Sequence, residues 1–384
     1  MTDLQTRAAR PATDTGLLRR PNVRLLVPDG YGNDALDQAQ HDRTALTRLL
    51  SDGAFHEHAE HSYIVYQLAS AGRTLTGVVV EISVDAYRQG RIRPHEDTSP
   101  ERERALATSL QELGAAFVPV TLMFDALPAL RARLAETMTA TPDTYTTSAD
   151  GVVQRAWRVT DPDAELALHS ELAALSTLHI ADGHHRMGAA ARHARRAELH
   201  GQPTASRFVL AALFPYEDMH VLGYHRCVAL PDAVPAADFL HAIRTSPGCA
   251  RLRECDRDAA VHTAPGVVGV YLDGSWYRLE LRRRISNSDP RSSLDIVALT
   301  ERILAPVLGV GNVSSDPRVT PVSGTAGAEG IAARCAENNE IGFILHPPTA
   351  EQVMAVADDG MVMPPKSTWF EPKARSGLFV HLLD

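Results

Sequence analysis

The sequence predicts a mixed α/β (α+β) fold, because strand-like and helix-like segments alternate along the chain. Runs rich in Val, Ile and Tyr predict strands at 62–69, 75–83, 115–124, 152–159, 207–214 and 220–230. Helical spacing of apolar residues predicts helices at 33–53, 100–114, 127–138, 163–175 and 187–201. The second half adds strands at 266–272, 275–282 and 340–346 and a helix at 293–309. Such a mixture is typical of α/β and α+β proteins rather than of barrels or bundles.

The length of 384 residues exceeds the usual size of a single hydrophobic core. We therefore expect two domains, joined near residues 215–232, and a loose tail over residues 1–20. No run approaches 18 consecutive apolar residues, and the N-terminus lacks the apolar core of a secretory signal. These features predict a cytoplasmic protein without a membrane partner.

The net charge of −9 argues against a surface that coats nucleic acid, although a local basic pocket could still bind a phosphorylated small molecule. The cysteines show neither CxxC pairing nor zinc-finger spacing. We expect reduced, mostly buried thiols at Cys227, Cys249, Cys255 and Cys335.

The stretch IADGHHR, residues 180–186, lies between a predicted strand at 176–180 and a predicted helix at 187–200. Gly183 permits a tight turn, and the first amides of the helix, with its dipole, form an anion site. Arg186 offers a planar fork suited to phosphate, and His184 or His185 can donate a further hydrogen bond. Asp182 would repel the same anion unless a cation such as Mg²⁺ lay between them.

Two other interpretations of this stretch remain open. A zinc site needs three or four convergent ligands, but adjacent histidines on one turn usually point apart and the HExxH spacing is absent. Alternatively, the stretch is a solvated helix start with Asp182 as its cap.

A second stretch, GRIRPHEDTSPERERAL, covers residues 90–106. Ser99 or Thr98 can cap a helix with Pro100 in its first turn, and a capping box of Thr98 with Glu101 is the other register. Capping does not require His95 or Glu96. These two residues are therefore candidates for a general base or a metal ligand.

A third stretch, MPPKSTWFEPK, covers residues 363–373. Lys366, Ser367 and Thr368 are similar to the end of a P-loop, but two prolines precede them in place of a glycine-rich cradle. The two prolines favour an extended backbone before Lys366, which could direct the lysine side chain toward an anion. The alternative is a C-terminal strand with a solvated lysine.

Taken together and in chain order, RPHEDT (93–98), IADGHHR (180–186) and MPPKSTWFEPK (363–373) resemble the bacterial and archaeal family called domain of unknown function 1015. Its members carry HE-T, ADGHHRYETA and MPPKSTYFxPK, and the resemblance covers most of the chain from about residue 60 onward. The DGHHR turn is also similar to that of the free-serine kinases of the ParB/sulfiredoxin-like superfamily. The resemblance implies a ParB/sulfiredoxin-like catalytic core over residues 21–215 and a C-terminal α/β domain over residues 216–384 that closes the site.

The same resemblance implies a small-molecule kinase. The donor would be ATP or ADP with Mg²⁺, and the acceptor would be free serine or a related hydroxylated amino acid. The alternatives are a nucleotide-binding ParB-like switch and a noncatalytic scaffold. The acidity of the chain and the lack of a convincing helix-turn-helix weigh against a nucleic-acid partner. A homo-oligomer is compatible with the sequence.

The resemblance also implies roles for individual residues. Glu96 would take the hydroxyl proton, and Asp182 would hold Mg²⁺ or position the acceptor; both are candidate metal ligands. His95 and His184 are further candidates for catalysis. The predicted nucleotide site consists of Gly183, His184, His185, Arg186, Lys366, Ser367 and Thr368.

The chain departs from the family pattern in two places. Met187 and Gly188 stand where the family has an aromatic residue and a glutamate, and LVPDGYGNDA (26–35) replaces a PPYDV-like segment. These departures leave the identity of the acceptor open. They suggest, as a hypothesis, a specialised substrate such as one of secondary metabolism.

Overall fold

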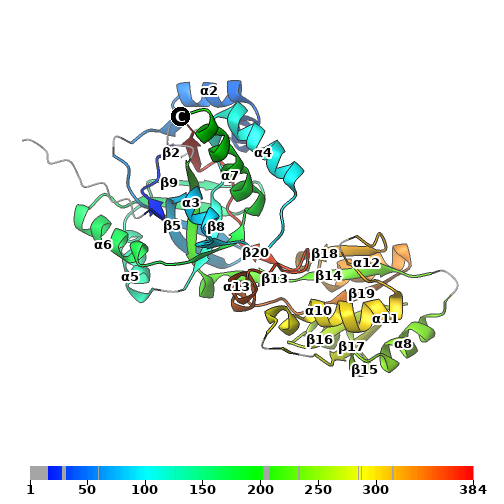
Figure 1. Cartoon of the computed structure of the whole chain (residues 1–384). Coiled ribbons are helices and arrows are strands. Elements are labelled where there is room, and N and C mark those ends of the chain that lie inside the picture. Colours follow the sequence, from blue (N-terminus) through cyan, green and yellow to red (C-terminus); the bar gives the residue numbers. More distant parts are fainter. Residues whose placement is uncertain are drawn as a thin grey trace, which may run out of the picture. The chain divides into compact units, whose positions relative to one another are not determined.

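The computed structural model describes residues 16–27, 32–58, 60–125, 127–201, 207–231, 234–283, 285–286, 288–313 and 315–383. The chain forms two compact units, and each contains both helices and sheets (Figure 1). The predicted mixed α+β class is therefore confirmed. No helix in these ranges is long and apolar enough to cross a bilayer.

Both units are discontinuous in sequence. The first consists of Met1–Ile92, Thr98–Asp218 and Ala374–Asp384, and the second of Arg93–Asp97 and Met219–Lys373. The predicted domains, 21–215 and 216–384, are each continuous, whereas in the structure Arg93–Asp97 belongs to the second unit and Ala374–Asp384 to the first, so the chain crosses between the units at these two short segments. These crossings arise because each short segment hydrogen-bonds to a part of its unit that is distant in sequence.

The main sheet of the first unit has the strand order β6-β11-β8-β12-β5-β4-β10-β9, with β1 beside β5. The neighbours β8 and β12 run parallel, whereas β12 and β5 run antiparallel. The strands are β1 (Leu18–Arg19), β4 (Ile64–Ser70), β5 (Arg73–Ser83), β6 (Ile92–Arg93), β8 (Val120–Phe124), β9 (Thr144–Thr147), β10 (Val153–Arg158), β11 (Leu178–Asp182) and β12 (Phe208–Pro215).

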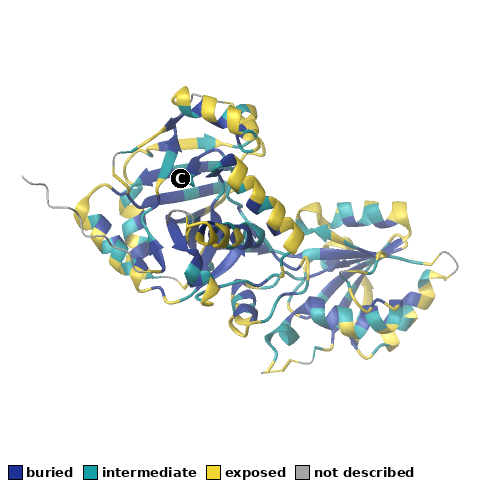
Figure 2. Ribbon diagram, turned by 45° about the horizontal axis from the view of Figure 1, so that its top comes forward, coloured by how far each residue is buried: buried dark blue, intermediate teal, exposed yellow. Residues whose placement is uncertain are grey.

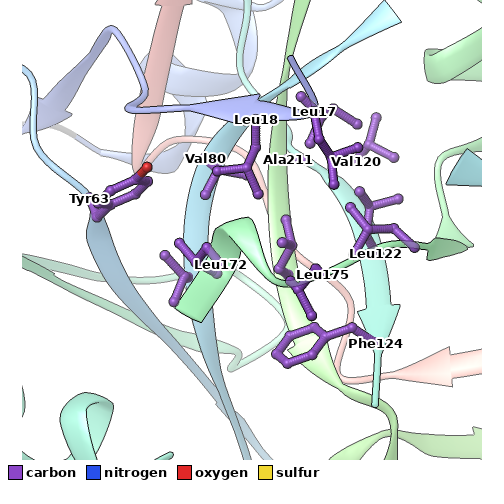
Figure 3. Close-up of a cluster of buried hydrophobic side chains, with 14 of the residues drawn as sticks. Leu17, Leu18, Tyr63, Val80, Val120, Leu122, Phe124, Leu172, Leu175 and Ala211 are labelled. Carbon is purple, nitrogen blue, oxygen red and sulfur yellow. The ribbon is translucent and has the colours of Figure 1, made fainter. Parts of the chain in front are cut away.

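One face of this sheet carries the larger hydrophobic core (Figure 3). Alternate strand residues such as Val80 and Leu122 pack there against Leu172 and other helical side chains. The helices that contribute are α3 (Val84–Arg88), α5 (Pro128–Thr137), α6 (Pro162–Ala173) and α7 (His184–Leu199).

The start of the described chain belongs to the same core. Leu17 and Leu18 are buried, and Leu18 pairs with Ile82 of β5. The prediction of a loose tail is therefore wrong for residues 16–20, because these leucines bury apolar surface against the sheet. Residues 1–15 of the predicted tail lie outside the described ranges.

The opposite face of the main sheet is covered by a smaller sheet with the order β3-β2-β21-β7. The ring of Tyr66 contacts both Phe214 and Phe379, which joins β4, β12 and β21. The strands and helices of this region are β2 (Val23–Leu26), β3 (Phe55–His56), β7 (Ala115–Ala116), β21 (Phe379–Leu382), α1 (Asn33–Ala39), α2 (Arg43–Ser51) and α4 (Pro100–Leu113).

The second unit contains a sheet with the order β15-β17-β16-β19-β14-β18 and a separate ribbon of β13 and β20. Its strand interiors are buried, and its helices expose their outer faces (Figure 2). The strands are β13 (His220–Leu222), β14 (Tyr224–Ala229), β15 (Cys249–Cys255), β16 (Val267–Leu272), β17 (Ser275–Leu281), β18 (Val319–Ser323), β19 (Glu340–Ile344) and β20 (Trp369–Glu371).

The helices of the second unit include short 3₁₀ segments and one π-helical segment. They are α8 (Ala236–Thr245), α9 (Arg257–Val261), η3 (Pro290–Ser293), α10 (Asp295–Leu299), η4 (Thr300–Leu304), α11 (Ala305–Leu308), η5 (Gly324–Ala326), α12 (Gly327–Asn338) and α13 (Ala350–Asp358). The 3₁₀ segment η2 (Tyr216–Asp218) belongs to the first unit, at the end of its second segment. The π-helical segment η4 interrupts the helix predicted for 293–309.

Two predicted strands are each divided between two sheets. The run 115–124 gives β7 and β8, with Pro119 in the break, and the run 220–230 gives β13 and β14 on either side of Gly223. The helix predicted for 33–53 is likewise divided into α1 and α2, because the Asp42 side chain caps a new helix by accepting from the amide of Thr44.

Candidate functional site

The turn between β11 and α7 is shorter than predicted. The strand continues to Asp182 and the helix begins at His184, so Gly183 alone connects them. Gly183 has φ +99°, and a Cβ there would lie 2.8 Å from Nη2 of Arg186. Glycine is therefore required both for the backbone conformation and for the close approach of the guanidinium.

The start of α7 has the features of an anion site. The first helical bond runs from the amide of Met187 to the carbonyl of Gly183 at 2.9 Å. The amides of residues 184–186 precede this bond and lie at the positive end of the helix dipole.

Asp182 and Arg186 form an ion pair across the turn. Nη2 of Arg186 lies 2.8 Å from Oδ2 of Asp182 and also donates to the carbonyl of Pro119 at 3.3 Å. Nε of Arg186 is buried and has no hydrogen-bond partner among the described residues. The N-cap is Gly183, so the interpretation of Asp182 as a helix cap is wrong.

Thr121 of β8 adds a polar group beside this pair that the sequence did not reveal. The ladder between β11 and β8 shifts between Ile180 and Asp182, and the shift sets Asp182 opposite Thr121. Oγ1 of Thr121 is buried and lacks a partner within the described ranges. Its position inside an apolar strand gave no signal of a polar site.

The two histidines of the turn have different environments. His184 is buried, with 4% of its surface exposed. Nε2 of His185 accepts a hydrogen bond from the amide of Ser99 at 3.2 Å. In the neutral ring the proton is therefore on Nδ1, which is the donor atom of this side chain. His185 thus also links α7 to the start of α4.

The start of α4 confirms one of the two predicted capping registers. Oγ of Ser99 accepts from the amide of Arg102, and Pro100 is the first helical residue. The predicted box of Thr98 with Glu101 is not formed, because Thr98 donates to Oε1 of Glu103 at 2.5 Å.

Glu103 lies against α7 at the position where the family pattern is broken. It also pairs with Nε of Arg192 at 2.5 Å. Burial opposes its ionisation, but the bonds from Thr98 and Arg192 outweigh burial and lower the pKa of Glu103. A Cβ on Gly188 would overlap Oε1 of Glu103. The carboxylate therefore occupies the space beside α7 where a side chain at position 188 would begin.

Met187, the other departure, is fully buried in the core of the first unit. Positions 187 and 188 thus both face packed protein. Residues 28–31, which contain part of the altered N-terminal segment, lie outside the described ranges.

In the second unit, the structure brings together the second and third motifs. Nε2 of His95 lies 3.2 Å from Oγ1 of Thr368, 273 residues away, and Thr368 donates to Oε1 of Glu96 at 3.4 Å. A hydroxyl has one hydrogen, so Nε2 of His95 must donate to Thr368. The amide of Met363 also donates to the carbonyl of His95 at 2.7 Å.

A buried arginine that the sequence did not single out holds the third motif in place. Arg226 of β14 donates to the carbonyls of Pro365 and Lys366, both at 2.9 Å. Burial lowers the pKa of Arg226 to about 10. Lys366 has φ +54°, and its side chain is exposed, with Nζ 5.9 Å from the ring centre of Tyr224.

Ser367 differs from its neighbours in the motif. Its Oγ is buried without a partner in the described part of the chain. The residue lines a cavity of about 80 Å³ together with Tyr224, Asp295 and His346. Of the predicted nucleotide residues of the third motif, Lys366 is thus exposed, Ser367 faces a small cavity, and Thr368 contacts His95 and Glu96.

Among the described residues, three potential metal-ligand side chains converge at Cys227, Cys335 and Glu340 rather than at the turn. Arg334 already pairs with Glu340 at 2.8 Å, which places a cation beside this cluster. The zinc interpretation of the turn thus has no support in the geometry. All four cysteines are free and three are buried, as predicted.

Comparison with known proteins identifies the family. A family model described as "Protein of unknown function (DUF1015)" matches residues 19–297. The chain belongs to the DUF1015 family. The match contains the first two motifs, and the third lies beyond it. No curated protein matches the chain.

Several solved structures are similar to this DUF1015 protein. A mutant free serine kinase in complex with AMP has a TM-score of 0.38 and 13% identity, and the alignment covers 78% of this chain and 92% of that one. C-terminally truncated SbnI from Staphylococcus aureus has a TM-score of 0.40 and 12% identity, with 78% and 85% covered. A conserved hypothetical protein from Pyrococcus furiosus has a TM-score of 0.34 and 13% identity, with 78% and 95% covered.

Proposed function

We propose that this protein is a small-molecule kinase that transfers a phosphoryl group from ATP or ADP to the hydroxyl of free serine or a related hydroxylated amino acid. The observation that carries the proposal is the Asp182–Arg186 pair at a strand-to-helix turn closed by Gly183. The similarity of the DGHHR motif to the turn of free-serine kinases supports the same function.

The turn has the groups that a phosphate needs. The guanidinium of Arg186 lies directly over Gly183, where no side chain intervenes, and its Nε is an unsatisfied buried donor in the described structure. Buried donors without partners are rare in native proteins, so a ligand that accepts from this atom would remove an unfavourable feature. Phosphate is suited to the planar fork of arginine and to amides at a helix start.

The Asp182–Arg186 pair also fits Mg²⁺, because a carboxylate oxygen is the ligand type that this ion prefers. When bound, Mg²⁺ would neutralise phosphate charge. Asp182 would then bind the ion in place of Arg186, and the guanidinium of Arg186 would be free to bind a phosphate oxygen.

Glu96 is the proposed general base. Its Oε1 accepts from Thr368, whose hydroxyl is fixed in turn by His95, so the carboxylate is held by two residues of its own unit. Glu96 takes the acceptor's hydroxyl proton, the oxygen forms the new bond to phosphorus, and the bond from phosphorus to the leaving nucleotide breaks. We assign His95 and Thr368 to positioning Glu96, and Lys366 to binding the donor's phosphates.

The function is tested by incubating the full-length protein with Mg²⁺, ATP or ADP, and a panel of hydroxylated amino acids. ³¹P NMR should detect a new phosphomonoester together with ADP or AMP. The matched control is Asp182→Asn, which keeps the size of the side chain and should give little product. Tight nucleotide binding without product from any acceptor would instead support a nucleotide-binding switch.

A further inference from the structure

The first unit contains a cavity of about 270 Å³ that none of the motifs explains. Its walls come from α4 and α7, from β12, and from the segment that contains β7. The ends of α1 and β21 complete it. The helices α4 and α7, which form two of these walls, lie side by side in Figure 1.

The lining of this cavity is mainly apolar. Leu106 and Leu110 face it from α4, Ala189 and Ala190 from α7, and Phe117 and Phe208 from the remaining walls. Removing an apolar ligand from water into such a lining is favourable, by roughly 25 cal/mol for each Å² that is buried.

The polar groups of the cavity are basic or neutral. No aspartate or glutamate is among its lining residues, whereas Arg186 and three histidines, His41, His193 and His381, are. The charge of Arg186 is paired with Asp182 through Nη2, and Asp182 is not among the lining residues.

Two lining residues carry buried nitrogen atoms without partners in the described structure. One is Nε of Arg186, and the other is Nδ1 of His381. His381 is 3% exposed, and its Nε2 lies 3.2 Å from Oε1 of Glu81. The carboxylate of Glu81 can only accept, so Nε2 donates to it and Nδ1 of the neutral ring is an acceptor.

We propose that this cavity binds a small organic carboxylate with an apolar body, such as an aryl-substituted short-chain acid. The apolar walls accept the body, and the guanidinium of Arg186 supplies hydrogen bonds for the carboxylate. The volume lies near the lower end of the range of about 300–1,000 Å³ for ligand pockets, which limits the ligand to about one ring or a short chain. This inference does not require the proposed kinase activity.

Binding is tested by isothermal titration calorimetry of the full-length protein without nucleotide. The probes are 3-phenylpropanoate, its neutral amide and acetate. We expect 3-phenylpropanoate to bind, the amide to bind at least about tenfold more weakly, and acetate to give no heat at the same concentrations. In Arg186→Gln the preference for the carboxylate over the amide should disappear.

Two variants fill the cavity from different helices: Ala190→Phe on α7 and Ser109→Trp on α4. Leu166→Trp, at an exposed position of α6, is the matched control. Thermal unfolding first establishes that each variant is folded. Both filling variants should weaken 3-phenylpropanoate binding at least tenfold, and the control should not. The proposal is overturned if 3-phenylpropanoate fails to bind, if the amide binds equally well, or if folded filling variants retain full affinity.

Discussion

At the scale of single residues, the turn between β11 and α7 depends on the lack of a side chain at Gly183. A side chain there would meet the guanidinium of Arg186, and the backbone adopts a left-handed conformation that L-residues avoid. The single glycine thus determines both where α7 begins and where Arg186 lies.

We predict that Gly183→Ala lowers the free energy of unfolding by about 1–2 kcal/mol through backbone strain, and also weakens nucleotide binding because it displaces Arg186. Gly90→Ala is the matched control, since Gly90 has φ +75° but no atom lies within 4 Å of the point that a Cβ would occupy. Urea unfolding and calorimetric nucleotide titration separate the two effects. Equal nucleotide affinity in both variants would contradict the role of Arg186.

A second residue, Glu81, carries a pH dependence that can be measured. Burial opposes its ionisation, but hydrogen bonding and charge from His381, the amide of Asn22 and Arg19 together lower its pKa to about 2. A carboxyl group whose pKa is lowered on folding stabilises the protein above the unfolded-state pKa. That stability is lost as the pH falls toward 2.

We therefore predict that the wild-type protein loses on the order of 3 kcal/mol from this group between pH 6 and pH 2. Glu81→Gln should be less stable than wild type at pH 6, and the difference should shrink as the pH falls. Urea unfolding at several pH values measures both. A difference that is independent of pH would show that the charge of Glu81 does not contribute.

At the scale of secondary-structure elements, the contact between α4 and α7 accounts for the unusual sequence after the turn. Glu103 occupies the space next to Gly188 and holds Thr98 and Arg192. The resemblance described in the sequence analysis implies a glutamate at position 188 itself. In this chain the carboxylate beside α7 comes from α4 instead.

This exchange predicts coupling between the two positions. Gly188→Glu alone should destabilise the protein by about 1–3 kcal/mol, because its side chain meets Glu103 in a packed interface. Adding Glu103→Ala should recover part of that loss, with a coupling energy of about 0.5–3 kcal/mol in a double-mutant cycle. Thermal and urea unfolding of the four proteins measure it. Strictly additive effects would mean that the two positions do not share the same space.

The sequence predicted most elements but not how they are divided among sheets. The strand at 75–83 was identified by its run of Val and Ile, since its central residues are buried on both faces, and the helix at 163–175 by the helical spacing of its apolar residues. Such patterns could not show that 115–124 contributes to two sheets, since both halves are equally apolar. The same limit applies to Thr121 and Arg226, whose partners are distant in sequence.

Part of the candidate site could be predicted from the sequence because its residues are close together in the chain. Asp182, Gly183 and Arg186 lie within one turn, so their proximity follows from the strand-to-helix context. The contact of His95 and Glu96 with Thr368 depends on tertiary folding, and the sequence did not predict it. The pairing of Asp182 with Arg186 was not anticipated, since the carboxylate was expected to require a separate cation.

At the scale of the whole molecule, the two units each take a segment from the other's part of the sequence. The segment that begins at Ala374 supplies β21 to the small sheet of the first unit, and Phe379 and Val380 of this strand are fully buried. Residues 93–97 join the second unit, where His95 is bonded to Thr368. Mutations in either of these two segments can therefore alter folding as well as activity. Each activity measurement on such a variant needs a stability measurement beside it.

The most direct test of the proposed phosphoryl transfer is the single-turnover rate of Glu96→Gln with the acceptor identified by ³¹P NMR. Loss of a general base typically lowers the rate 10²–10⁴-fold. We predict a fall of about this size with nearly unchanged nucleotide Kd, whereas Glu101→Gln, on the exposed surface of α4, should retain wild-type turnover. Unchanged turnover in Glu96→Gln would contradict the account.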